Sequence, residues 1–156
     1  MDTEIKNETS LKDEKTAEFL DKLYKNVKMG SESLIALMPK AKDQKLRTDM
    51  SVQLGKYEKF AASISKELFD LGREPKEENI VTKASAKIGI AMNTMIDSTS
   101  SHIAQMITEG SNMGIDSTIK QLREYENQPV SEQSMRIARE FIEFEEKNVE
   151  TMRAYL

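Results

Sequence analysis

The 156-residue sequence contains no cysteine. Its absence excludes a disulfide framework, a thiolate zinc site, a cysteine-ligated iron–sulfur cluster and a cysteine nucleophile. Only three prolines and six glycines are present, and aromatic residues make up 6% of the chain. Because turn formers and the aromatic and β-branched residues of sheets are scarce, while strong helix formers dominate, long helices are favoured over short strands. The composition therefore predicts an all-α fold.

The sequence also lacks a large excess of one charge and a long hydrophobic run. Its net charge is −4 with a pI near 5.2, and without a basic stripe nucleic-acid binding is not expected. The longest weakly charged stretch, residues 88–108, is interrupted by Asn93, Asp97 and His102, which favours a buried helix over a membrane span. The N-terminus is charged and no apolar segment of a signal peptide follows it, which predicts a cytoplasmic protein.

Apolar residues at steps of three and four predict four long helices. These helices are expected over residues 11–38, 43–71, 80–113 and 131–156. Pro39 should end the first helix, while Asp43 is a candidate N-cap and Gly72 a candidate C′ residue of the second. The pattern predicts a single domain, residues 11–156, after a disordered polar tail at residues 1–10.

The predicted third helix is weakened near its end. Gly110 and Gly114 should interrupt it, so a short extra helix is expected over residues 115–122, before Pro129. The predicted linker between the second and third helices, residues 73–79, reaches about 23 Å. A bundle helix of this protein would be about 43 Å long. A crossover along the bundle would be out of reach, so an antiparallel up-down-up-down four-helix bundle is predicted.

Glu145 breaks the pattern of the fourth predicted helix. The other charged residues of this helix lie on its outer face, whereas Glu145 lies in the apolar stripe between Ile142 and Val149. Burying an unpaired carboxylate costs several kcal/mol, so Glu145 needs a partner or a proton. The candidate partners are Tyr57, Tyr24, Gln53 and His102. A tyrosine hydroxyl is favoured, because it can donate a hydrogen bond without bringing a second charge. If only neutral donors surround Glu145, its pKa should be raised.

Polar residues also interrupt the inner stripes of the other helices at mid-length. Together they predict a buried polar layer consisting of Tyr24, Ser31, Gln53, Tyr57, Thr99, His102, Glu145 and Asn148. Such a layer can be a satisfied network that fixes the register of the helices, or it can be a metal or ligand site. His102, the only histidine, lies on the flank of its stripe, which favours a position at an edge or interface over a ligand position.

Two segments, with the sequences MNT…SHIA (residues 92–104) and FIEFEEKN (residues 141–148), resemble an uncharacterised family of small bacterial helical proteins. That family is similar in turn to the ferritin-like bundles. Ferritin-like di-iron proteins hold their metals with a Glu from each of two helices and a Glu-x-x-His from each of the other two. Of the corresponding positions only Glu145 matches, while Glu32 and Glu58 lie near the same level but off the inner faces.

Two functions follow from these patterns. The first is a non-catalytic bundle without a cofactor that acts through its surface, as a homo-oligomer or a module that binds another protein. It is suggested by the incomplete site and by the low charge of residues 88–108, and it predicts that Ile90 is covered by another subunit or by the short extra helix. The alternative is a divergent ferritin-like protein that binds iron or manganese through Glu145 and His102 with Glu32 or Glu58.

Overall fold

The structure is a computed structural model that describes residues 2–76 and 98–156. The described residues form helices and turns and no strand, which confirms the predicted all-α fold. The elements are α1 (Asp2–Leu37), η1 (Met38–Lys40), α2 (Gln44–Asp70), α4 (Ser100–Tyr125), α5 (Glu132–Met152) and η2 (Arg153–Tyr155), where η denotes a 3-10 helix. Within the described ranges, no helix is long and apolar enough to cross a membrane.

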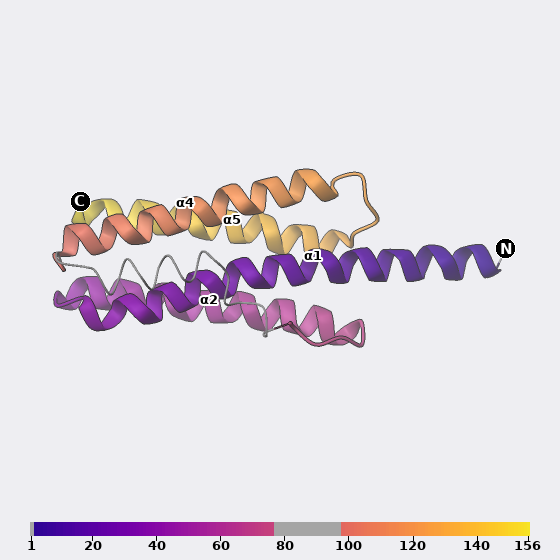
Figure 1. Cartoon of the computed structure of the whole chain (residues 1–156), viewed down its shortest axis with the longest axis horizontal. Helices are drawn as coiled ribbons and strands as arrows, with labels where there is room; N and C mark the ends of the chain where they lie inside the picture. The colour runs from indigo at the N-terminus through magenta and orange to yellow at the C-terminus, as the bar shows by residue number, and fades with distance from the viewer. Residues whose placement is uncertain (1, 77–97) are drawn as a thin grey trace.

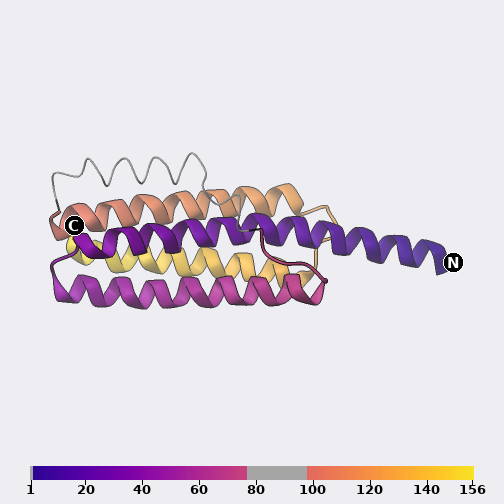
Figure 2. The same ribbon diagram turned by 60° about the horizontal axis from the view of Figure 1, so that its bottom comes forward.

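α1 begins at Asp2, where the sequence predicted a disordered tail. Residues 2–14 are exposed and helical, and they extend beyond the other helices (Figure 1 and Figure 2). No proline or glycine precedes Gly30, so nothing in the sequence stops the helix from continuing outward from its packed part. At its other end α1 stops at Leu37 and the chain enters a 3-10 turn that contains Pro39, as the sequence predicted.

α2 begins and ends where the sequence predicted. The Asp43 carboxylate accepts a hydrogen bond from the backbone N–H of Leu46 at 2.8 Å, so Asp43 is the N-cap. Gly72 has a φ of 72°, and the next residue, Arg73, donates its backbone N–H to the carbonyl of Leu68 at 2.9 Å. This is the bond of a Schellman motif, which requires the left-handed conformation that glycine adopts without strain.

α4 begins later than the predicted third helix. Thr99 is its N-cap, because the Thr99 hydroxyl accepts a hydrogen bond from the backbone N–H of His102 at 3.2 Å. The predicted helix over residues 80–113 is therefore wrong at this point, since the chain is not helical at residues 98–99. The rest of that expectation, residues 80–97, lies outside the described residues.

α4 also continues further than predicted. It runs without interruption through Gly110 and Gly114 to Tyr125, so the separate short helix at residues 115–122 was wrong. A glycine costs a helix about 1 kcal/mol relative to alanine. The packing of α4 against its neighbours outweighs that penalty. α5 then begins after Ser131, whose hydroxyl accepts a hydrogen bond from the backbone N–H of Ser134, as predicted for the fourth helix.

The directions of the helices differ from the predicted order. In Figure 1, α1 and α2 form one antiparallel pair and α4 and α5 form another, while α2 and α4 run in the same direction. Contacts between α1 and α4 agree with this view: the Gln121 amide donates to the carbonyl of Phe19 at 2.7 Å, and Lys22 pairs with Glu124 at 3.0 Å. The middle of α1 thus lies against the late part of α4.

The predicted up-down-up-down order is therefore wrong for α2 and α4. The prediction assumed that residues 73–79 alone connect these helices, but α4 begins only at Ser100. Residues 71–99 could span roughly 95 Å when fully extended, whereas a helix of the length of α2 is about 40 Å long. A connection along the whole bundle is within the reach of this segment.

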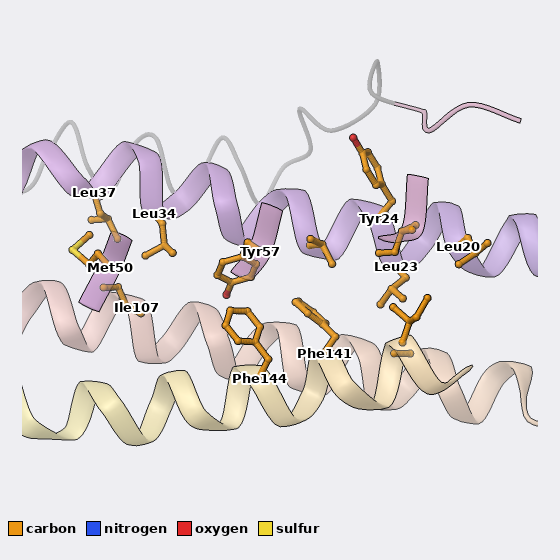
Figure 3. Packing of buried hydrophobic residues seen from close by; sticks show 14 of the residues in the cluster. Leu20, Leu23, Tyr24, Leu34, Leu37, Met50, Tyr57, Ile107, Phe141 and Phe144 are labelled. Carbon is orange, nitrogen blue, oxygen red and sulfur yellow. The ribbon is translucent and has the colours of Figure 1, made fainter. Parts of the chain in front are cut away.

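The core lies along the axis between the helices. In Figure 3, Leu34 and Leu37 point from α1 toward Ile107 on α4, and the ring of Tyr57 lies beside Phe144. Four aromatic rings pack together near the middle of the bundle: Tyr57, Phe60, Phe141 and Phe144. The ring centroids of Tyr57 and Phe144 are 4.8 Å apart in an edge-to-face arrangement, which is a favourable geometry for two aromatic rings.

Candidate functional site

Glu145 lies on the inner face of α5 and only 2% of it is exposed. The hydroxyl of Tyr57 on α2 donates to Glu145 Oε1 at 2.5 Å, a length typical of hydrogen bonds to a charged oxygen. The structure thus gives Glu145 the tyrosine partner that was expected from the sequence. The other tyrosine that was a candidate partner of Glu145, Tyr24, is also buried. In Figure 3, however, its ring points away from Tyr57 and Phe144.

Two glycines allow these side chains to occupy the middle of the bundle. A Cβ atom on Gly30 of α1 would lie 2.7 Å from Cζ and 2.9 Å from the hydroxyl oxygen of Tyr57. A Cβ atom on Gly114 of α4 would lie 3.3 Å from Oε1 of Glu145. The backbone of α1 therefore approaches the phenol as closely as only glycine permits, and the backbone of α4 approaches the carboxyl group more closely than most residues with a Cβ atom would.

Burial controls the acidity of the pair. It raises the pKa of Glu145 from 4.5 to about 7, although hydrogen bonding from Tyr57, Ser111 and Asn148 acts in the opposite direction. Burial also raises the pKa of Tyr57 well above its ordinary value, and the negative charge of Glu145 adds to this effect. Near neutral pH, Glu145 is therefore divided between its protonated and ionised forms, while Tyr57 keeps its proton.

Several buried polar atoms around Glu145 have no hydrogen-bond partner in the described part of the chain. They are Oε2 of Glu145, Nδ2 of Asn148 and both side-chain amide atoms of Gln53. Ser111 and Asn148 lie close enough to lower the pKa of Glu145, yet Oε2 accepts no well-formed hydrogen bond. Unsatisfied buried polar groups are rare in folded proteins, and each one calls for an explanation.

The side chain of Glu145 is part of the lining of a pocket. The pocket has a volume of about 90 Å³, lies between α1 and α4, and reaches Tyr57 and Glu145. Its walls combine apolar side chains with small residues: Met29, Gly30, Leu34 and Leu37 from α1, and Met106, Ile107, Gly110, Ser111 and Gly114 from α4. Gln53 and Asn148 instead line a second pocket of about 250 Å³ between α2 and α5.

The structure buries most members of the predicted polar layer, although in Figure 3 the ring of Tyr24 points away from Tyr57. Six of its eight members are buried, and these are Tyr24, Ser31, Gln53, Tyr57, Glu145 and Asn148. Thr99 is exposed because it is the N-cap of α4, and His102 is partly exposed in the first turn. His102 lies about 18 Å along the helix from Gly114, the residue beside Glu145. Neither Thr99 nor His102 therefore belongs to the layer.

Ser111 is a member of the site that sequence reasoning missed. It is 2% exposed and lines the pocket beside Gly114. The spacing of the sequence indicated that Ser111 is buried, because it follows Ile103 and Ile107 at steps of four. The buried positions of α4 then continue with Thr118. The mistaken break at the two glycines concealed this regular stripe.

The predicted metal ligands do not come together. Glu32 and Glu58 are exposed, and His102 lies at the far end of α4 from Glu145. Among the residues that the structure describes, no group of three or more histidine, aspartate or glutamate side chains is placed to hold a metal ion. The described part of the site is thus a single carboxyl group with a phenol partner.

No protein-family model, curated protein or solved structure matches this chain, so its site is interpreted from its own geometry.

Proposed function

We propose that this chain is a non-catalytic helical bundle that functions by binding, and that its binding site is the pocket between α1 and α4. The observation that carries the proposal is the buried side chain of Glu145, which lines the pocket and whose Oε2 atom has no hydrogen-bond partner among the described residues. A buried ionisable group with a strongly perturbed pKa in a pocket is a common mark of a functional site. A small ligand that donates a hydrogen bond to this carboxyl group would offset part of the cost of burying it.

The lining of the pocket supports binding over catalysis. Its described residues include one carboxyl group, Glu145, and the hydroxyl of Tyr57 is already donated to that group. The remaining walls are mostly apolar or small. Apolar walls with a few polar atoms that fix orientation are typical of sites for small organic molecules. An apolar cavity of about 150 Å³ can hold benzene, so this smaller pocket suits a ligand of about four carbon atoms.

Methionine methyl groups can report directly on occupancy of this pocket. Met29, Met106 and Met113 line it, whereas Met50 and Met152 are fully buried and are not among its lining residues. In protein labelled with ¹³C at the methionine methyl groups, n-butanol, butyrate and n-butylammonium would each be added at millimolar concentration. At least one of these probes should shift the NMR signals of the Met29, Met106 and Met113 methyl groups. The signals of Met50 and Met152 should stay in place.

Two matched glycine variants complete the test. A Cβ atom at Gly110, which lines the pocket, would have nothing within 4 Å, and the same is true of Gly55 in α2, which does not line it. Gly110→Leu should therefore block the pocket and abolish the shifts, while Gly55→Leu should preserve them. If no probe shifts the pocket methionines of the unaltered protein, the pocket is not a binding site.

The metal-binding alternative keeps one supporting observation. α2 and α4 run in the same direction and residues 71–99 connect them, and ferritin-like folds likewise contain one long crossover. We propose a ferritin-like relationship on this ground, with Glu145 as the candidate ligand for iron or manganese. Stoichiometric metal in protein purified without chelators would favour this function. Metal-free protein whose stability does not change when iron or manganese is added would contradict it.

Self-association, predicted from the sequence, is a separate proposal. It is supported by residues 2–14 of α1, which extend beyond the other helices and expose Ile5 at 57% and Leu11 at 47%. An isolated helical segment of this length is only marginally stable in water, so a second copy packed against it would stabilise it. Ile90, which was expected to be covered, lies outside the described residues. A strict monomer in sedimentation experiments would contradict the proposal.

A further inference from the structure

The carboxyl group of Glu145, which lines the pocket between α1 and α4, has no positively charged partner among the described lining residues. Tyr57 already donates to Oε1 of Glu145, but Oε2 has no partner. No lysine, arginine or histidine is among the described residues that line the pocket. An ionised Glu145 would therefore be a buried charge without a counter-ion, which is strongly unfavourable unless a ligand supplies one. An anionic ligand would instead be repelled.

Two hydroxyl groups in the lining of the pocket can accept additional hydrogen bonds. Ser33 and Ser111 both line the pocket. The hydroxyl of Ser33 donates to the carbonyl of Met29 at 2.7 Å, so its oxygen can still accept through its lone pairs. An ammonium group has three N–H donors and no acceptor. It would therefore complement a pocket whose lining offers a carboxyl group and hydroxyl oxygens, while a single neutral hydroxyl would satisfy fewer of them.

The walls select a hydrocarbon body behind the charged group. Leu34 and Leu37 from α1 face Ile107 from α4 across this region, as Figure 3 shows. The thioether side chains of Met29 and Met106 add polarizable apolar surface that adapts to irregular ligands. The volume of about 90 Å³ limits the enclosed part of the ligand to a short chain.

We infer that this pocket binds a protonated primary amine with a short aliphatic chain, its ammonium group beside the carboxyl group of Glu145 and its carbons between α1 and α4. The inference rests on the proposed binding function and specifies its ligand. A bare divalent cation is a weaker candidate, because such ions take several oxygen ligands and the described residues contain no group of three or more acidic or histidine side chains around Glu145.

Selectivity for charge at constant size tests this inference. n-Butylammonium, n-butanol and butyrate share a four-carbon chain and differ in the head group. Titration calorimetry near pH 8, where Glu145 is mostly ionised, would give their affinities for the unaltered protein. Because a hydrogen bond between charged groups is stronger than a neutral one, n-butylammonium should bind at least about tenfold more tightly than n-butanol. Butyrate should bind most weakly of the three.

Two variants assign the selectivity to one carboxyl group. Glu145→Gln keeps the shape of the side chain and removes its charge, so it should lose the preference for n-butylammonium over n-butanol. Glu146→Gln makes the same change at an exposed position of α5 and should keep the preference. The comparison of the three probes on the unaltered protein remains decisive even if Glu145→Gln does not fold.

The possible outcomes separate this inference from the proposed function. If n-butanol binds as tightly as n-butylammonium, or if Glu145→Gln keeps the preference, the amine assignment is overturned while the pocket remains a binding site. If none of the probes shifts the methyl signals of Met29 and Met106, the binding function itself is overturned. A preference for n-butylammonium that depends on Glu145 and is abolished by Gly110→Leu supports both.

Discussion

Replacing Gly30 with alanine should destabilise the bundle by about 1–3 kcal/mol, as expected for overpacking of a core. The added Cβ atom would lie 2.7 Å from Cζ of Tyr57. The Tyr57 ring has little room to move, because it packs edge to face against Phe144 with the ring centroids 4.8 Å apart and its hydroxyl is bound to Glu145. Alanine favours a helix over glycine by about 1 kcal/mol, but the clash should outweigh that gain.

Gly55→Ala is the matched control for this experiment. Gly55 lies within α2, and a Cβ atom there would meet nothing within 4 Å. This variant should therefore be more stable than the unaltered protein by about 1 kcal/mol. Urea-induced unfolding followed by circular dichroism would measure both changes. If Gly30→Ala gained as much stability as Gly55→Ala, the close packing of Tyr57 against α1 would be refuted.

The free energy of unfolding should depend on pH through Glu145. Burial raises the pKa of this residue from 4.5 to about 7 in the folded state. Between these values the folded state holds a proton that the unfolded state has released, so stability falls as pH rises through this window. The loss attributable to Glu145 should be about 3 kcal/mol in total. Tyr57 is the other titratable group facing Glu145 among the described residues, and its pKa is raised further above this window.

Glu145→Gln should remove this contribution, because glutamine does not titrate. Relative to the unaltered protein, the variant should gain about 3 kcal/mol of stability between about pH 4 and about pH 8. Glu146→Gln is the control, since Glu146 is exposed on the same helix, and its stability difference should vary little over the same range. Urea denaturation at several pH values would measure these differences. A stability difference for Glu145→Gln that is independent of pH would contradict the burial of an ionisable carboxyl group.

Local signals explain which parts of the fold could be predicted from the sequence. The ends of α2 were correct because Asp43 and Gly72 act within a few residues of themselves, through a side-chain cap and a left-handed turn. The position of Glu145 was predictable for a similar reason. A charge within an apolar stripe must face the core wherever the helix packs.

Other features depend on contacts between distant parts of the chain. Gly110 and Gly114 lower helix propensity, but the packing of α4 keeps the helix continuous. The direction of α4 relative to α2 depended on the length of their connection, which was underestimated when the third helix was expected to begin near residue 80. The pocket was not predictable either, because it arises where small residues of two helices leave space that neighbouring side chains do not fill.

The carboxyl carbon of Glu145 reports most directly on the buried acid that lines the pocket between α1 and α4. Protein labelled with ¹³C at the glutamate side-chain carboxyl groups would be titrated by NMR, and the Glu145 signal would be assigned by its loss in Glu145→Gln. The pKa should be about 7 in the free protein. It should fall when n-butylammonium is added, because the ligand binds the ionised form. A pKa near the ordinary glutamate value of about 4.3 that does not respond to n-butylammonium would contradict both the burial of Glu145 and its role in binding.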